Sequence, residues 1–162
     1  MFRTNGIKSR LAAGDSVFGC WIGSGSPVNA EILGHVGFDF LLVDQEHGEG
    51  ELSYAVSVLR AADSSGTPCL VRVPSNDPVW FKRILDAGAD SLMVPSVGTA
   101  EEAEAVVRAC RYPPEGIRGY AAPIVRASNY GMVKDYIRRA NDNLLIVVQI
   151  ESADAVAHAA EI

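Results

Sequence analysis

Short apolar runs alternate with longer amphipathic segments along the chain. The apolar runs predict strands at residues 17–22, 38–44, 68–73, 91–95 and 144–150. The segments between them repeat apolar residues at helical spacing and predict helices at 27–36, 51–63, 77–88, 99–111 and 132–142, with a further helix beginning at 152. Ser26 before Pro27, and Thr99 three residues before Glu102, are typical of helix starts.

Repeated strand–helix units with nearly continuous apolar strands predict a parallel sheet covered by helices, which is an α/β fold. No predicted helix begins with a G-x-G-x-x-G loop, so a dinucleotide-binding sheet is disfavoured. A TIM (β/α)8 barrel is favoured, because the chemistry of such barrels lies at the carboxyl ends of the strands. Polar or aromatic side chains stand at or just beyond those ends here: Trp21, Asp44, His47, Arg72, Gln149 and Glu151.

The length of the chain limits how much of a barrel it can form. A complete barrel takes about 250 residues, whereas this sequence has 162. We therefore expect residues 1–162 to belong to a single barrel domain and to supply about its first five β/α units. The C-terminal part of the barrel is then missing from the chain.

The composition is that of an ordinary globular protein, with 48% hydrophobic and 21% charged residues. A net charge of −6 argues against a nucleic-acid-binding surface, which is usually basic. The sequence has neither a signal-peptide pattern nor an apolar run long enough to span a bilayer. Cys20, Cys69 and Cys110 are scattered without metal-site spacing, so we expect reduced thiols in a cytoplasmic protein.

His47 is the first candidate for chemistry. It follows the predicted strand 38–44 by three residues, in a loop with Gly48 and Gly50. An imidazole suits proton transfer near neutral pH. Asp44 or Glu46 could orient its ring. The alternative is a surface histidine with charged neighbours.

Glu151 and Arg72 are the other two candidates. Glu151 follows the apolar strand 144–150, and Gln149 points to the same side of that strand. A buried carboxylate at this place costs free energy unless it is paired, hydrated or bound to a cation, so Glu151 is a candidate ligand for an ion such as Mg²⁺. The alternative interpretation is a carboxylate that is stabilised by the N-terminus of the helix beginning at 152.

Arg72 lies near the end of the strand 68–73. Its guanidinium is suited to bind a carboxylate through two hydrogen bonds or to stabilise an oxyanion. The alternative interpretation is a structural salt bridge.

The stretch 112–131 predicts a long irregular loop. Its prolines and glycines favour a rigid turn. Loops of this length are usually functional or disordered. Tyr112, Ile117 and Tyr120 offer surface for packing, which favours an ordered loop.

Six sequence blocks, in this order along the chain, resemble the HpcH/HpaI aldolases, the metal-dependent class II pyruvate aldolases. The blocks are GCW, GFDFLLVDQEHG, VRVPSNDPVWFKRILDAGAD, RYPPEGIRG, RASNYG and VVQIES. This family includes the 2,4-dihydroxyhept-2-ene-1,7-dioate and 2-dehydro-3-deoxyglucarate aldolases. The resemblance covers nearly the whole chain, and it does not specify the substrate.

The resemblance implies a (β/α)8 barrel and a homo-oligomer, a hexamer built as a dimer of trimers. It implies a carbon–carbon lyase that cleaves, or forms, 4-hydroxy-2-keto acids, with pyruvate or an analogue and an aldehyde as the other reactants, through an enolate that a divalent metal ion stabilises. Mg²⁺ or Mn²⁺ is the favoured ion, with Co²⁺ and Zn²⁺ as alternatives. Neither a nucleic-acid nor a membrane partner is expected.

The resemblance also implies roles for individual residues. His47 matches the catalytic base, and Arg72 matches the arginine that stabilises the enolate. Trp21 is expected at the substrate-binding site. Asp86 matches the acid that raises the basicity of the histidine, but Asp44 is the nearer candidate in the sequence, so both stay open.

Gln149 matches the amide that contacts the keto acid, and Glu151 matches a metal ligand. The family's second carboxylate ligand belongs to a GPxDL motif that this sequence lacks. Two other interpretations therefore stay open. One is an acyl-CoA lyase of the citrate-lyase β-chain type, which the EHG and VRVP blocks disfavour. The other is an inactive half-barrel that acts only in assembly, which the absent ligand favours.

Overall fold

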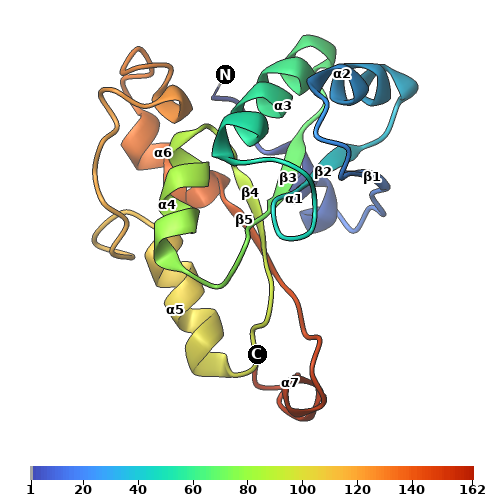
Figure 1. Cartoon of the computed structure of the whole chain (residues 1–162). Helices are drawn as coiled ribbons and strands as arrows, with labels where there is room; N and C mark the ends of the chain where they lie inside the picture. Colours follow the sequence, from blue (N-terminus) through green and yellow to red (C-terminus); the bar gives the residue numbers. More distant parts are fainter. Residues whose placement is uncertain (1) are drawn as a thin grey trace.

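The computed structural model describes residues 2–162, which contain one parallel sheet of five strands (Figure 1). The strands are β1 (Gly19–Ile22), β2 (Phe40–Asp44), β3 (Cys69–Arg72), β4 (Ser91–Val94) and β5 (Leu145–Val148). They lie side by side in the order of the sequence, and each neighbouring pair is parallel. Successive strands of a (β/α)8 barrel are arranged in the same way. The prediction of an α/β fold that supplies five barrel units is confirmed.

Helices alternate with the strands as predicted. α2 (Pro27–Val36), α3 (Leu52–Ser65), α4 (Pro78–Asp86) and α5 (Ala100–Cys110) follow β1 to β4 in turn, and α7 (Ala153–Ala157) follows β5. Ser26, Asp77 and Thr99 accept backbone hydrogen bonds as the N-caps of α2, α4 and α5. The buried side chains of α2–α5 pack on one face of the sheet and form the main core.

Residues of each strand point alternately to the two faces of the sheet. Leu41 and Val43 of β2 belong to the main core under the helices. Leu42 and Leu70 belong to a separate apolar cluster, together with partly buried Val147. We call the face that carries this second cluster the inner face, because it corresponds to the interior of a barrel.

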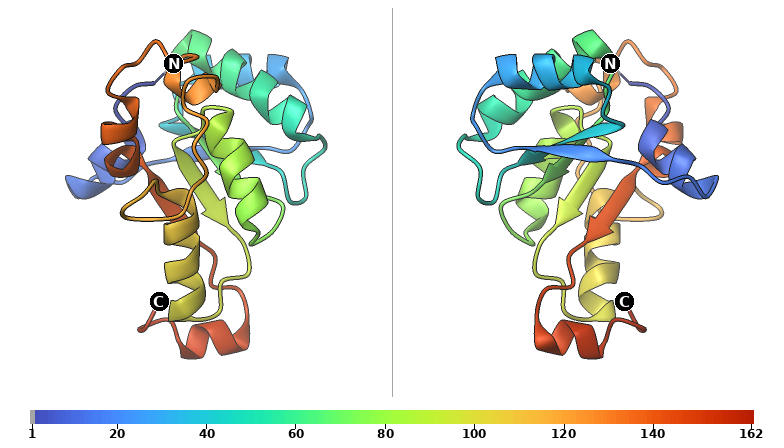
Figure 2. Two further views of the ribbon diagram at one scale, coloured as in Figure 1. Left: turned by 90° about the vertical axis from the view of Figure 1, so that its left-hand side faces the viewer. Right: turned by 90° about the vertical axis from the view of Figure 1, so that its right-hand side faces the viewer.

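One helix was not predicted. α1 (Gly6–Ala12) precedes the first strand and lies on the other side of the sheet from α2 and α3 (Figure 2). Its buried residue, Ile7, packs with Leu42 and Leu70 on the inner face. The strand–helix alternation carries no information about a helix that precedes the first strand.

Asn5 fastens this N-terminal segment to the sheet. Its side chain accepts a hydrogen bond from the backbone of Lys8 at 2.9 Å and so caps α1. Its amide donates to Ser91 Oγ at 2.9 Å and to the backbone carbonyls of Asp90 and Asn143 at 3.0 and 3.1 Å. These buried contacts close the amino-terminal end of β4 and β5.

The helix predicted before the last strand begins later than expected, and forms α6 (Tyr136–Asn143). Asn129, Tyr130 and Gly131 have φ values of 53°, 56° and 82°. A right-handed helix cannot continue through such residues, so they end the short 3₁₀ helix η1 (Arg126–Ser128). Residues 132–135 form turns and irregular backbone, so α6 begins only after Asp135.

The long segment between α5 and α6 packs against the protein as an ordered loop. Tyr112 is 2% exposed and lies in an apolar cluster that Tyr136 of α6 completes. Ile117 and Tyr120 are exposed instead. Tyr120 nevertheless packs the edge of its ring against Tyr112, with 6.5 Å between the ring centres, so two of the three residues predicted to pack, Tyr112 and Tyr120, do so.

The three cysteines are unpaired, as predicted. Burial raises the pKa of the Cys69 and Cys110 thiols to about 12, which keeps them protonated and unreactive. Within residues 2–162, no helix combines the length and the apolar character that a membrane crossing requires.

Candidate active site

Candidate residues from two strand ends meet on the inner face. Asp44 and Arg72 are the last residues of β2 and β3, and the sheet register pairs them directly. Each stands two residues beyond an inner-face leucine, so both point to that face. Gln149 stands two residues beyond inner-face Val147 and has the same orientation. The register of a parallel sheet therefore gathers these side chains at the carboxyl end of the inner face.

Asp44 and Arg72 form a buried bidentate pair. Arg72 donates from Nε to Oδ1 at 2.9 Å and from Nη2 to Oδ2 at 2.6 Å. Burial acts to raise the pKa of Asp44, but hydrogen bonds from Arg72 and from two backbone N–H groups outweigh it, so this pKa lies below its ordinary value. The hydrogen bond to Asp44 raises the pKa of Arg72, burial opposes that rise, and the charge of Glu151 adds to it. Both groups are charged at neutral pH.

Trp21 covers the open side of this pair. The Arg72 guanidinium lies 4.5 Å from the centre of the Trp21 ring, which is cation–π distance. Trp21 is 52% exposed, although tryptophan is usually buried. We call Trp21, Asp44 and Arg72 the mouth cluster. It reaches solvent through Trp21.

Asp44 also shapes the loop that carries the histidine. Its Oδ1 accepts hydrogen bonds from the backbone N–H groups of Glu46 and His47 at 3.0 and 3.2 Å. Gly48 is required in this turn, because a Cβ there would overlap the carbonyl oxygen of Asp44. Asp44 therefore anchors the backbone of His47 rather than its ring.

Glu46 is the carboxylate that faces the imidazole. Its Oε2 lies 3.9 Å from His47 Nε2 and 3.0 Å from Arg72 Nη1. The sequence left Asp44 and Glu46 as alternative partners of the ring. The structure places the Glu46 carboxylate between the imidazole and the guanidinium, and the His47 side chain is 74% exposed.

Glu151 belongs to a second polar group at the same end of the sheet. Its Oε1 accepts hydrogen bonds from the backbone N–H of Ser96 at 2.8 Å and from Ser96 Oγ at 3.1 Å. Its Oε2 accepts from Gln149 Nε2 at 3.1 Å, while Gln149 Oε1 is buried without a hydrogen-bond partner. A cavity of about 470 Å³, lined in part by Ser96, Gly98 and Glu151, opens beside the carboxylate.

These oxygens fit part of a hard-cation site. Across residues 2–162, no group of three or more His, Cys, Asp or Glu side chains is placed to hold a metal ion. A hard divalent cation, however, often takes one or two carboxylates and completes its coordination with water and substrate. Glu151 provides one carboxylate, and Gln149 Oε1 is a buried acceptor without a hydrogen-bond donor among residues 2–162.

Asp86 lies apart from these residues. It ends α4, which runs back from the carboxyl end of β3, and its Oδ1 accepts a hydrogen bond from Arg118 Nη2 at 2.7 Å. The Arg118 guanidinium stacks 4.4 Å from the centre of the Tyr112 ring. We call Asp86, Tyr112 and Arg118 the base cluster. Within one chain the structure does not bring Asp86 to His47.

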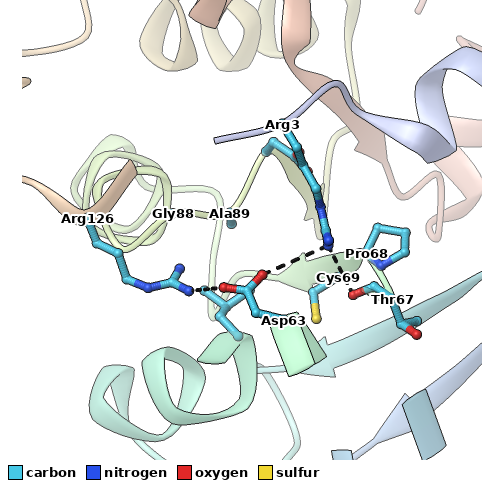
Figure 3. Close-up of a pocket in the computed structure, with 10 residues that line it drawn as sticks. Arg3, Asp63, Thr67, Pro68, Cys69, Gly88, Ala89 and Arg126 are labelled. Atoms are coloured by element: carbon cyan, nitrogen blue, oxygen red, sulfur yellow. Dashed lines mark hydrogen bonds and ion pairs between the residues drawn. The ribbon is translucent and has the colours of Figure 1, made fainter. Parts of the chain in front are cut away.

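A polar pocket also lies at the amino-terminal end of the sheet, around Asp63 (Figure 3). Arg126 Nη2 lies 2.5 Å from Asp63 Oδ2, and Arg3 Nη2 lies 4.0 Å from Asp63 Oδ1. The cavity volume is about 30 Å³, which is room for a single water molecule. The pocket is too small for a keto acid, and its charges already pair with one another.

Sequence reasoning missed Ser96. Ser96 lies just after β4, much as Asp44 and Arg72 lie at the ends of β2 and β3. A polar residue directly after the apolar run 91–95 was the signal in the sequence that could have identified it. Its contact with Glu151 depends on the β4–β5 pairing, which joins residues 55 positions apart.

The comparisons with known proteins agree with the fold. Residues 17–162 match the family described as HpcH/HpaI aldolase/citrate lyase. A hydroxypyruvate/pyruvate aldolase of Roseovarius nubinhibens is 45% identical over 152 residues, which cover 92% of this chain and 58% of that protein. A 5-keto-4-deoxy-D-glucarate aldolase of Escherichia coli is 44% identical over 152 residues, covering 94% and 59%.

Solved structures give the same result. A crystal structure of an HpcH/HpaI aldolase/citrate lyase family protein from Burkholderia cenocepacia J2315 matches with a TM-score of 0.91 and 41% identity, covering 96% of this chain and 63% of that one. The chain thus spans 58 to 63% of the length of these three proteins.

Proposed function

Because this chain belongs to the HpcH/HpaI aldolase/citrate lyase family, we propose that the protein is a metal-dependent aldolase. It cleaves, or forms, a 4-hydroxy-2-keto acid, with pyruvate or a close analogue and an aldehyde as the other reactants. The observation that carries this proposal is the mouth cluster, in which a buried, braced arginine faces a solvent-exposed indole at the carboxyl end of the sheet. Relatives named as aldolases support the reaction class.

Arg72 is suited to stabilise negative charge on the keto acid. Asp44 holds two of its nitrogens, and Glu46 lies 3.0 Å from the third. A guanidinium has five N–H donors, so donors remain for a substrate oxygen. Because its position is fixed before substrate binds, little reorganisation is needed when charge develops. Trp21, over the guanidinium of Arg72, and Gln149, at the carboxyl end of the inner face, would contact the keto acid.

His47 is the proposed base. It takes the proton from the 4-hydroxyl group as the C3–C4 bond breaks and the aldehyde carbonyl forms. The electron pair of that bond passes to the keto-acid half as an enolate, and a proton returned to C3 completes pyruvate. Anchoring of the His47 backbone by Asp44 fixes where the loop presents the imidazole.

Glu151 would hold the metal ion, with the Gln149 amide beside it. When bound, a divalent ion polarises the carbonyl of the keto acid. Oxygen ligands favour Mg²⁺ or Mn²⁺. The GPxDL motif that carries the family's second carboxylate ligand is absent from this sequence, so Glu151 would contribute only part of the coordination.

Asp86 can act on a histidine only across a subunit boundary. In its own chain it lies at the end of α4, paired with Arg118. We propose that the protein is a homo-oligomer, and that a role of Asp86 in catalysis requires the His47 of another protomer. A closed symmetric oligomer would repeat such a contact at every equivalent interface.

The reaction can be tested directly with the purified protein. After treatment with EDTA, the protein is incubated with 4-hydroxy-2-keto acids that differ in the aldehyde part, with and without Mg²⁺ or Mn²⁺. Pyruvate is measured by NADH oxidation with lactate dehydrogenase. We expect pyruvate release that EDTA abolishes and added metal restores. Absence of release with every metal and substrate would contradict the proposal and favour a role in assembly only.

A further inference from the structure

Ser96 has an unusual backbone conformation for its residue type. It follows β4 and has φ of 56°, in the left-handed region. Among the described residues with a Cβ, only Asn129 and Tyr130 share a positive φ. This conformation is unfavourable for a residue with a Cβ, and it persists only where the surroundings impose it.

The left-handed turn points two donors at one oxygen atom. Both the N–H and the Oγ of Ser96 lie within hydrogen-bond distance of Glu151 Oε1, at 2.8 and 3.1 Å. A carboxylate oxygen has two lone-pair positions. Ser96 therefore occupies both acceptor positions of Oε1.

The other oxygen of Glu151 keeps an open position. Oε2 accepts one hydrogen bond, from Gln149 Nε2 at 3.1 Å. The second lone pair of Oε2 has no donor among the described residues. Ser96 thus does more than hold a loop: it fixes the carboxylate plane and leaves Oε2 as the oxygen that is available.

We propose that Ser96 is a positioning residue for the Glu151 carboxylate, which sets the orientation in which this carboxylate meets a divalent cation. The proposal rests on the proposed function, in which Glu151 is a metal ligand. Groups that orient a ligand through hydrogen bonds commonly change metal affinity by about 10- to 100-fold when they are removed.

Three substitutions in the full chain separate the hydroxyl donor from the backbone conformation, and all three keep the backbone N–H donor. Ser96→Ala removes the Oγ donor and keeps the Cβ. Ser96→Gly removes the same donor and relieves the left-handed conformation. Ser96→Thr retains the hydroxyl. Mn²⁺ affinity is measured by electron paramagnetic resonance of free Mn²⁺, and the melting temperature is measured for each variant. Glu151→Gln serves as the reference for loss of the ligand.

We expect Ser96→Ala and Ser96→Gly to bind Mn²⁺ about 10-fold more weakly, with the melting temperature of Ser96→Gly unchanged or raised. Ser96→Thr keeps the hydroxyl donor and should keep most of the affinity, while its melting temperature should fall, because a β-branched side chain is disfavoured at positive φ. Tyr130→Gly is the matched control, because it relieves the same conformation in a distant exposed loop. It should leave Mn²⁺ affinity unchanged.

The metal role of Glu151 and the positioning role of Ser96 give different results in these measurements. If the parent protein binds Mn²⁺, Glu151→Gln loses it and both Ser96 variants bind as the parent does, the positioning role is overturned and the metal site stands. A lower melting temperature of Ser96→Ala or Ser96→Gly with unchanged Mn²⁺ affinity would likewise show that Ser96 is only structural. If the parent does not bind Mn²⁺, the metal role of Glu151 is overturned and the positioning role with it.

Discussion

The mouth cluster and the base cluster use the same kinds of side chain in different surroundings. In each, an arginine is hydrogen-bonded to an aspartate and lies over an aromatic ring, at 4.5 Å in the mouth cluster and 4.4 Å in the base cluster. The ring is 52% exposed at the mouth, for Trp21, and 2% exposed at the base, for Tyr112. A buried arginine–aspartate pair is therefore not by itself a sign of function. The exposure of its neighbours decides whether a ligand can reach it.

The largest effect that we expect concerns the histidine beside the mouth cluster. His47→Ala removes the proposed base, so turnover should fall about 10²- to 10⁴-fold. His35→Ala is the matched control, because His35 is exposed on the last turn of α2, away from the mouth. It should leave turnover unchanged. Near-normal pyruvate release by His47→Ala would show that the mouth cluster works without this imidazole.

A paired substitution then compares the two arginines. Arg72→Lys keeps the charge and loses the bidentate fork, so turnover should fall about 10²- to 10³-fold, as when an oxyanion donor is lost. Arg118→Lys should lower the melting temperature and reduce turnover less than Arg72→Lys does, because its buried guanidinium can act on catalysis only through its pair with Asp86. Pyruvate release and thermal melts are measured for both. If Arg72→Lys and Arg118→Lys lost turnover equally, the mouth cluster and the base cluster would not differ in function.

The sequence predicted the parts of the mouth cluster better than their contacts. Apolar strands that end in polar residues predicted the sheet, its helices and the positions of Asp44 and Arg72. The Asp44 carboxylate accepts hydrogen bonds from Arg72 and not from the His47 ring, because the β2–β3 register pairs Asp44 with Arg72. Hydrophobic periodicity does not specify which residues of neighbouring strands face one another.

The base cluster was less predictable. Arg118 meets Asp86 across 32 residues of chain, through a loop that has no repeating pattern. The role assigned to Asp86 came from the resemblance alone, and within the chain its carboxylate pairs with Arg118. α1 was missed because a helix before the first strand does not follow from the alternation of strands and helices. Ser96 follows an apolar strand, but its contact with Glu151 spans 55 residues and depends on the β4–β5 pairing.

A mixing experiment tests whether Asp86 of one protomer acts on His47 of another in the proposed homo-oligomer. His47→Ala and Asp86→Asn should each be poorly active alone. If the Asp86 of one protomer serves the His47 of another, an equal mixture reassembled from subunits should recover about a quarter of the parental turnover, because that share of sites has both native residues. Reassembled single variants are the controls. A mixture no more active than its components would confine Asp86 to its pair with Arg118.

Two aspartates extend the comparison to pH. Hydrogen bonds lower the pKa of Asp44 against the effect of burial. Burial raises the pKa of Asp90, which lines a cavity together with Arg118, even though a hydrogen bond from Ser91 and the charge of Arg3 oppose that rise. The charged form of Asp44 therefore stabilises the fold, whereas the charged form of Asp90 destabilises it.

Asp44→Asn and Asp90→Asn should consequently shift the melting temperature in opposite directions at pH 7, by about 2–4 °C for each kcal/mol of altered stability. The contribution of Asp44 is complete above the unfolded-state pKa of about 3.9 and is lost as pH falls through its lower folded-state value. The loss of melting temperature in Asp44→Asn should therefore become smaller in acid.

The contribution of Asp90 to stability is complete below the unfolded-state pKa of about 3.9, and it is lost as pH rises through the raised folded-state pKa. The gain from Asp90→Asn should accordingly appear with rising pH and vanish in acid. Melts of the parent and both variants from pH 3 to pH 8 measure these trends, and shifts of the same sign at pH 7 would show that the two ends of the sheet do not differ in how they hold a buried charge.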